Sequence, residues 1–234
     1  MSETTYGEPA AANSADVERR DAEGRVIERA EFRGGVLHGT TAVLAPSGLV
    51  LQEMGFAQGQ PDGPMLVHDD NGQLSARLTW LAGSLDGPTT IFTAGRILAE
   101  MTYRVGRLDG EMRTYSEAGV LVATGTYRGG QLNGVMTIYR PNGSVIRTMR
   151  YVDGLLDGEA TDFDERGVVR TRTLFKAGRQ DGLMIAYDNN ARSIVQTMFS
   201  ADRQIGEKRS LNQNVLKSVR PWYQRLKDKT RRGC

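Results

Sequence analysis

Residues 103–119 (YRVGRLDGEMRTYSEAG) and residues 127–143 (YRGGQLNGVMTIYRPNG) share one frame of amino acids, shifted by 24 positions along the chain. Both stretches place Tyr, Gly, Leu, Asp or Asn followed by Gly, a second Tyr and a last Gly at matching positions. These residue types form turns and pack strands. The shared frame therefore determines the architecture much more closely than the function.

The frame recurs along most of the chain. Its second glycine, called the anchor glycine below, recurs eight times at spacings of 23 or 24 residues: Gly39, Gly63, Gly87, Gly110, Gly134, Gly158, Gly182 and Gly206. An aromatic residue lies seven positions before each anchor: Phe32, Phe56, Trp80, Tyr103, Tyr127, Tyr151, Phe175 and Phe199. Such a period is typical of stacked repeats.

Each repeat is predicted to contain two strands and two turns. Leu121, Ala123, Gly125 and Tyr127 alternate with other residues at period two, which indicates a strand with one packed face. The glycine that ends SEAG or RPNG supplies the positive φ of a short hairpin. We therefore expect an all-β fold, an elongated array of antiparallel hairpins with about eight repeats, which would extend roughly 75 Å. One hairpin alone cannot bury its apolar face.

Three regions follow from composition. Residues 1–15 are small and polar and are predicted to be a disordered leader, residues 16–206 form the array, and residues 207–234 form a tail. The tail carries a net charge of +7 and the rest of the chain −5. No apolar run is long enough to cross a bilayer, no secretory signal is recognisable, and Cys234 is the single cysteine, so we expect a cytoplasmic protein.

The tail is predicted to be a helical cap on the array. Its apolar residues fall on one helical face, and basic residues lie opposite: Val215, Leu216, Val219, Trp222, Tyr223 and Leu226 against Lys217, Arg220, Arg225, Lys227 and Lys229. The segment would cover the last open sheet edge. A membrane-surface or partner-binding role, through Lys217, Arg220, Trp222, Arg225 and Lys227, stays open. Nucleic acid is not expected as a partner, because the array is acidic.

No set of residues predicts catalysis, a cofactor or a metal. His38 and His68 lie far from Cys234 and form no metal-ligand pattern. The glycine pairs Gly34–Gly35 and Gly129–Gly130 precede strands rather than helices, which argues against a phosphate loop.

Two rows of residues recur with the repeat. Acidic residues precede five anchor glycines, at Asp62, Asp86, Asp109, Asp157 and Asp181, with Asn133 in the same place once. They either form an acidic edge for a basic partner or hydrogen-bond the local turn, and the Asp-to-Asn exchange favours the turn. Aromatic residues follow five anchors at Phe92, Tyr115, Tyr139, Phe163 and Tyr187, called the aromatic row below. The row either grips a partner or forms a second packed ladder.

The frame Y-x-x-G-x-L-x-G-x-x-x-x-Y-x-x-x-G resembles the MORN repeat, over about residues 25–206. It is most similar to the bacterial variant known as the antitoxin or immunity component of toxin–antitoxin modules. The resemblance implies a non-catalytic protein that binds and neutralises a cognate toxin or effector. The alternative is a membrane-associated scaffold that binds anionic lipid through the basic tail. Both interpretations predict that the chain is not an enzyme.

Overall fold

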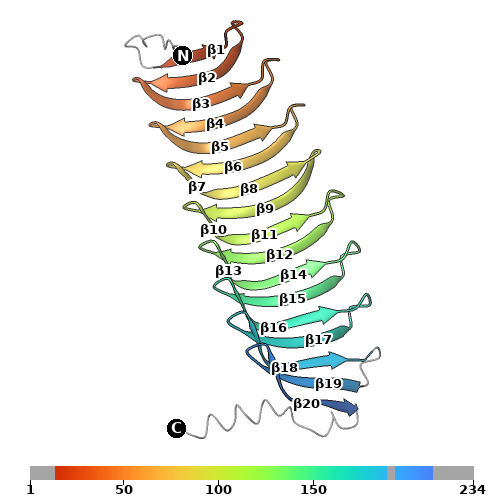
Figure 1. The fold of residues 1–234 in the computed structure, drawn as a ribbon. Coiled ribbons are helices and arrows are strands. Elements are labelled where there is room, and N and C mark those ends of the chain that lie inside the picture. The colour runs from red at the N-terminus through yellow and green to blue at the C-terminus, as the bar shows by residue number, and fades with distance from the viewer. Residues whose placement is uncertain (1–13, 189–192, 213–234) are drawn as a thin grey trace, which may run out of the picture. The chain divides into compact units, whose positions relative to one another are not determined.

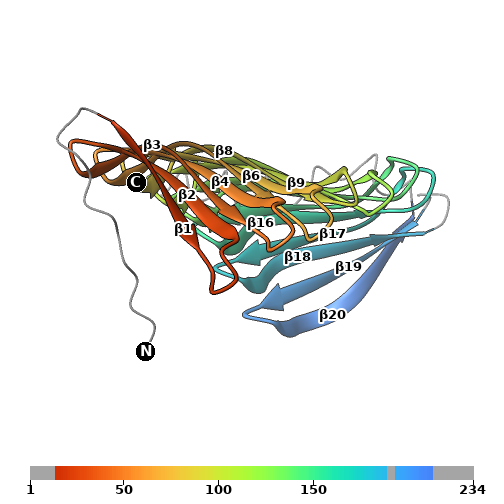
Figure 2. The ribbon, with the colours of Figure 1, turned by 90° about the horizontal axis from the view of Figure 1, so that it is seen from above.

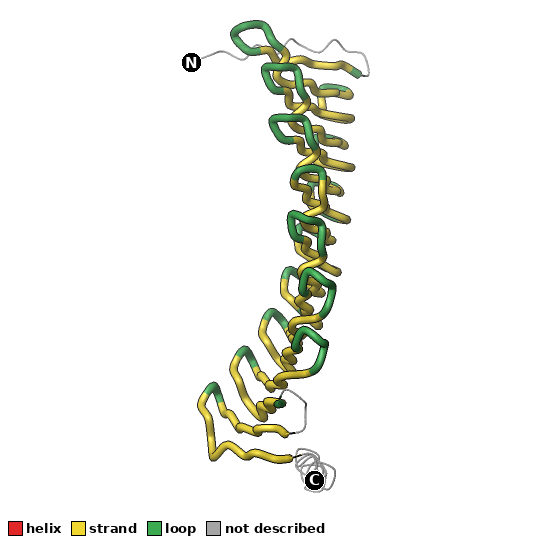
Figure 3. Tube along the Cα trace, turned by 90° about the vertical axis from the view of Figure 1, so that its right-hand side faces the viewer, coloured by secondary structure: helices red, strands yellow, loops and turns green. Residues whose placement is uncertain are grey.

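The structure is a computed structural model that describes residues 14–188 and 193–212. These residues form 20 β-strands joined by turns and no helix, which confirms the all-β prediction (Figures 1 and 3). The chain divides into two compact bodies, Met1–Gln131 and Leu132–Cys234, called the N-terminal and C-terminal bodies and described separately. Within each body the strand pairs are antiparallel and join strands that follow one another in the chain, except that β6 also pairs with β8 and β9 with β11, past a two-residue strand.

The N-terminal body is an open antiparallel sheet whose strands follow sequence order (Figure 1). Its strands are β1 (Ala15–Arg20), β2 (Val26–Arg33), β3 (Val36–Leu44), β4 (Val50–Ala57), β5 (Gln60–His68), β6 (Leu74–Leu81), β7 (Ser84–Leu85), β8 (Gly87–Thr93), β9 (Arg96–Arg104), β10 (Arg107–Leu108), β11 (Gly110–Tyr115) and β12 (Leu121–Arg128).

The C-terminal body has the same arrangement. Its strands are β14 (Gly134–Tyr139), β15 (Val145–Val152), β16 (Leu155–Phe163), β17 (Val169–Lys176), β18 (Arg179–Tyr187), β19 (Ser193–Ser200) and β20 (Arg203–Asn212). The short β13 (Gln131–Leu132) lies at the division between the bodies. Each pair consists of consecutive strands, so the meander predicted from the repeats is present in both bodies.

Two kinds of turn alternate along each body and lie at opposite ends of the strands (Figure 1). The tight turns have two residues, both with positive φ, as in Val105–Gly106 at 47° and 72° and Asp153–Gly154 at 48° and 81°. This conformation matches the twist of the flanking strands. The wide turns are the predicted SEAG and RPNG segments, and their glycines have the expected positive φ, 79° at Gly119 and 81° at Gly143.

The single 23-residue spacing has a structural cause. Between Gly87 and Gly110 the wide turn is replaced by a second tight turn, Ala94–Gly95, with φ of 47° and 74°. It joins β8 directly to β9. The tight turn is one residue shorter than a wide turn, which accounts for the 23-residue spacing and leaves the strand order unchanged.

The anchor glycines mark irregular points in the ladder. The first seven have φ between 101° and 136°, a region that is essentially restricted to glycine. A Cβ at Gly110 would lie 3.1 Å from the Cβ of Thr102, and one at Gly182 would lie 3.1 Å from the Cβ of Leu174. The pairing register shifts at the equivalent points of several pairs, for example between Met149 and Tyr151. Bulges of this kind bend strands, and the long strands of each body are visibly curved (Figure 2).

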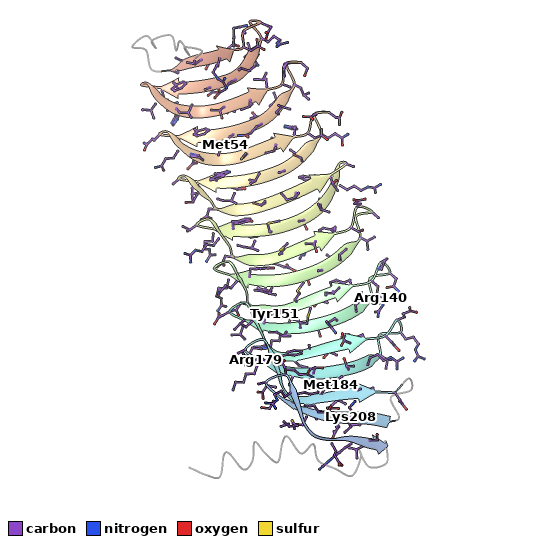
Figure 4. All side chains as sticks on the ribbon, in the orientation of Figure 1. Met54, Arg140, Tyr151, Arg179, Met184 and Lys208 are labelled. Atoms are coloured by element: carbon purple, nitrogen blue, oxygen red, sulfur yellow. The ribbon has the colours of Figure 1, made fainter. Side chains whose placement is uncertain are left out.

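The two faces of the sheet differ in composition. One face, called the ladder face, carries the aromatic residues seven positions before each anchor and, between them, most of the methionines: Met54, Met65, Met101, Met112, Met136, Met149 and Met184. Figure 4 labels two of them, Met54 and Met184, on their strands. The other face, called the opposite face, carries Thr, Glu, Arg and Pro in most repeats. Among the described residues only Leu44, Met54, Ala99, Ala160 and Ile194 are buried hydrophobic side chains. Each body is therefore a single layer whose faces both remain accessible.

The structure does not support the helical cap expected over residues 207–234. Residues 207–212 belong to β20, which pairs with β19 from Ser193–Asn212 to Ser200–Arg203. Strand pairing thus continues past Gly206, where the array was expected to end. The rest of the predicted tail, including Lys217, Arg220, Trp222, Arg225 and Lys227, lies outside the described residues, as does most of the predicted leader.

Candidate functional site

The acidic residues before the anchor glycines are part of the fold. Each carboxylate accepts a hydrogen bond from the first N–H of the tight turn in the following repeat. The donor–acceptor distances are 3.1 Å for Ala82 to Asp62, 3.0 Å for Val105 to Asp86, 3.0 Å for Gly129 to Asp109, 3.1 Å for Ala177 to Asp157 and 3.3 Å for Ala201 to Asp181. The acidic residues thus hydrogen-bond main-chain N–H groups of a turn, as one of the two interpretations predicted. The turn they bind belongs to the next repeat, however, so these bonds join consecutive repeats and do not close the local turn.

A main-chain bond accompanies each of these contacts. The second residue of the tight turn donates to a carbonyl of the preceding repeat, for example Gly106 N to Leu85 O at 2.8 Å and Gly178 N to Leu156 O at 2.9 Å. Both N–H groups of these five tight turns are thus satisfied by the repeat before each turn. His38 occupies the acidic position in the first repeat, where its Nδ1 lies 3.5 Å from Gln58 N.

The aromatic row lies on the opposite face. Arg113 pairs with Glu100 and with Thr124, and alternation along β11 places Tyr115 on the same side as Arg113. Tyr139, Phe163 and Tyr187 end their strands at the equivalent point, and Phe92 lies next to the end of β8. All five side chains are half-buried. The row is therefore separated by the sheet from the ladder aromatics and is not a second ladder on the same face.

Tyr115 shows how the row is held in place. Its hydroxyl donates a 2.6 Å hydrogen bond to Oε2 of Glu100 on the neighbouring strand. This bond to the carboxylate, with a smaller contribution from burial, raises the pKa of Tyr115 above its ordinary value. The ring is oriented by the bond while its edge stays accessible. A shallow hollow of about 210 Å³ lies beside it, lined by Pro88, Thr102, Glu111 and Arg113 among others.

A second hollow lies at the start of the N-terminal body. It measures about 440 Å³, and its charged lining consists of Asp16, Glu18, Glu31, Glu53 and Arg29. Arg29 also forms an ion pair with Glu18, with 3.3 Å between Nε and Oε1. Carboxylates outnumber the guanidinium here, so this part of the opposite face is acidic and attracts positive charge.

The described residues contain no group of three His, Cys, Asp or Glu side chains placed to hold a metal ion. None of the described residues forms a helix long and apolar enough to cross a membrane. His68 lies in the same repeat position as the aromatic row, and its Nδ1 is buried without a hydrogen-bond partner. The residues that carry charge in the array are mostly occupied in turns, in the contacts between repeats and in surface ion pairs.

Sequence reasoning missed the bonds between repeats. The signal was present, because each Asp and the tight turn that it meets lie 19 or 20 residues apart. It also missed the methionines of the ladder face, which recur two residues after or nine residues before an anchor glycine. Both features follow from aligning the repeats column by column.

The fold and these faces define an open antiparallel β-repeat protein. A family model described as "MORN repeat variant" matches residues 108–128, which cover the end of one repeat and the start of the next. The match supports the assignment to the MORN repeats made from the sequence frame. Comparison with curated proteins finds no match.

Several solved structures share local similarity with the chain. The crystal structure of the GtfA/B complex bound to UDP and GlcNAc has 13% identity and a TM-score of 0.25, over 60% of this chain and 25% of that chain. A porin-like protein from Bacteroides uniformis has 11% identity and a TM-score of 0.20, over 85% and 94% of the two chains. TcdB2-TccC3-TEV has 12% identity and a TM-score of 0.16, over 85% of this chain and 15% of that one. This chain thus spans a quarter of the first of these proteins, and no conclusion rests on scores this low.

Proposed function

We propose that this chain is a non-catalytic binding protein whose array holds a protein partner on the opposite face, and that the partner is a toxin or effector which it neutralises. The observation that carries the proposal is the single-layer sheet, in which a face with half-buried aromatic side chains has no covering layer among the described residues. Aromatic residues of this kind serve as anchors in protein interfaces. The MORN repeat match is consistent with a repeat protein that binds rather than catalyses.

The N-terminal body offers the best-defined binding surface. Phe92 and Tyr115 lie on its opposite face, and the hollow lined by Asp16, Glu18, Glu31 and Glu53 lies on the same face. Aromatic anchors give contact area, and the carboxylates steer a positively charged partner during encounter. We therefore propose that the toxin surface bound here is basic.

The membrane-scaffold alternative depends on the basic tail, whose residues Lys217, Arg220, Trp222, Arg225 and Lys227 lie outside the described residues. The array itself is net acidic and would be repelled by anionic lipid. For this reason we propose that the array, and not the tail, holds the main partner.

The test uses the proteins encoded next to this chain's gene. Each is expressed alone and together with this chain, and one of them should arrest growth unless this chain is present. The purified pair should bind in calorimetry, and Phe92→Ala with Tyr115→Ala should weaken binding by at least about 2 kcal/mol, while Tyr127→Phe on the ladder face leaves it unchanged.

A second pair of variants separates steering from anchoring. Glu31→Gln with Glu53→Gln should slow association and reduce its salt dependence, and Glu117→Gln in an exposed wide turn should not. Circular dichroism controls for folding. If no neighbouring product is neutralised, and vesicles that contain phosphatidylserine co-sediment with the protein through its tail, the toxin-binding proposal fails.

A further inference from the structure

The end of the C-terminal body departs from the repeat pattern in three columns on one face. Eight residues before an anchor, successive repeats carry Glu31, Gly55, Thr79, Thr102, Thr126 and Arg150, and then Leu174 and Met198. One residue after an anchor, the earlier repeats carry Thr40, Pro64, Pro88, Glu111, Val135 and Glu159, then Leu183 after Gly182 and Glu207 after Gly206. Apolar residues thus enter both columns of the opposite face near the end of the C-terminal body.

The third departure is Ile205. It occupies the position where earlier repeats place Asp, Asn or His to bind the next tight turn, and β20 is the last strand that the structure describes. Ile205 pairs with Met198, and Met198 pairs with Leu183, so the three side chains lie in a row across β18, β19 and β20. Ile205 is 49% exposed and Leu174 is 40% exposed.

Three of these side chains line a hollow of about 390 Å³. Leu183, Met198 and Ile205 are its apolar lining, called the apolar floor, and Gln196, Glu207 and Arg209 are its polar lining. Docking surfaces commonly combine apolar and polar residues in this way. We call Leu174, Leu183, Met198 and Ile205 the terminal patch.

We propose that residues 213–226 of the same chain dock on the terminal patch, with Trp222 placed against its apolar floor. The chain leaves β20 at Asn212 and reaches its first apolar residue, Val215, three positions later. Ile205 lies about 24 Å back along β20 from Asn212. The ten residues from Asn212 to Trp222 would span about 15 Å as one helix. Pro221 opposes an unbroken helix and favours an extended residue before it, and this extended step lengthens the reach of Trp222 toward the patch.

In this arrangement the segment covers the opposite face of the last strands. An edge cap would instead cover the N–H and C=O groups along the outer edge of β20. The departures from the repeat explain why a face is favoured. Covering an edge requires no change at Leu174, Leu183 or Met198, which lie on β17, β18 and β19. Apolar residues in positions that are otherwise mostly polar are explained by an apolar segment that covers them.

The test follows the fluorescence of Trp222 in the full chain. Trp80→Phe leaves Trp222 as the single tryptophan, and it is mild because four repeats carry Phe in that column and the Trp80 Nε1 has no hydrogen-bond partner. In this background, acrylamide should quench Trp222 severalfold less than in concentrated urea. Leu174→Thr with Met198→Thr, which restores the residue of three earlier repeats, should raise quenching to the urea level.

Two further variants complete the experiment. Leu183→Glu introduces the residue found at Glu111 and Glu159 in that column. It should have the same effect as the threonine pair and replaces it if that pair misfolds. Val135→Thr removes an apolar side chain of similar exposure, 48%, from the same column outside the terminal patch and should leave Trp222 protected.

Four results would overturn the proposal. The first is quenching of Trp222 in the parent equal to that in urea, and the second is protection of Trp222 that survives Leu174→Thr, Met198→Thr and Leu183→Glu. The third is protection from quenching that is lost when the protein is diluted, which indicates docking on a second copy. The fourth is protection that appears only when anionic vesicles are present.

Discussion

The amide of Asn133 donates a hydrogen bond to the carboxylate of Asp153, with 2.8 Å between Nδ2 and Oδ1. Elsewhere the acidic residue precedes the anchor glycine and receives a main-chain N–H of the next tight turn. In this repeat the acid lies in the tight turn and the amide precedes the anchor. The two positions have exchanged roles, and the contact between repeats is preserved.

This exchange predicts a pairwise dependence. Asn133→Asp places two carboxylates in contact and should lower the free energy of unfolding by about 1 kcal/mol at pH 7. Asp153→Gly added to it restores the Asp–Gly arrangement of Asp109 and Gly129 and should recover most of the loss. Urea unfolding of the parent, of Asn133→Asp, of Asp153→Gly and of the double variant measures the coupling. Additive losses would show that the two positions act independently.

Val105 is a β-branched residue held at φ 47° in a tight turn, where 69% of its surface is exposed. β-Branched side chains are strained in this region. Val105→Gly should therefore stabilise the protein by up to about 1 kcal/mol despite the greater entropy of glycine in the unfolded chain. The control is Val122→Gly in β12, which should destabilise it. Thermal unfolding decides the sign, and a loss at Val105 would contradict the strain.

The two classes of glycine should respond differently to alanine. Gly143 has φ 81°, and a Cβ added there would meet nothing within 4 Å, so Gly143→Ala carries backbone strain alone, about 1 kcal/mol. Gly110 has φ 135° and would bring a Cβ within 3.1 Å of Thr102, so Gly110→Ala should cost more. Gly143→Val should destabilise by at least about 1 kcal/mol. Equal urea midpoints for the two alanine variants would rule out the added steric cost.

Acid should weaken the wide turns. Oδ1 of Asp164 accepts the N–H of Val168 at 2.8 Å and that of Arg166 at 2.9 Å, and these bonds, with Arg170 and Arg166 nearby, lower its pKa. A lowered pKa contributes stability above the unfolded value, about 3.9, that is lost as the pH falls through the folded value. The same sign holds for Asp162, whose burial would raise the pKa but whose bonds from Arg147 and Thr171 prevail and lower it.

The unfolding midpoint should accordingly stay level between pH 7 and 5 and fall below about pH 4. Asp164→Asn should lower the midpoint at pH 7 and flatten the fall, and Glu165→Gln, an exposed carboxylate of the same turn, should do neither. Identical acid profiles for Asp164→Asn and the parent would contradict the assignment.

Local patterns in the sequence were sufficient for the repeat, the hairpins, the ladder face and the positive φ of Gly119 and Gly143. Each depends on residues within one repeat: alternation assigns Ala123 and Tyr127 to one side of a strand, and glycine is required where φ is positive. The assignment of Leu121 to that side is wrong, because the register shifts between Thr114 and Tyr115 and pairs Leu121 with Tyr115. The contacts of the residues in the aromatic row could not be predicted from such local patterns. Tyr115 could be placed on the opposite face only once the pairing of Arg113 with Glu100 was known.

The tertiary structure alone decided which groups the acidic residues bind. Asp86 lies next to Gly87 and could have closed its own turn, but its carboxylate accepts the N–H of Val105 in the next repeat. Stacking sets that partner, because neighbouring strands lie about 4.8 Å apart and the next tight turn comes within hydrogen-bond distance of the carboxylate. The apolar patch at Leu183, Met198 and Ile205 also needed the pairing register, since it joins residues from three strands that no local pattern connects.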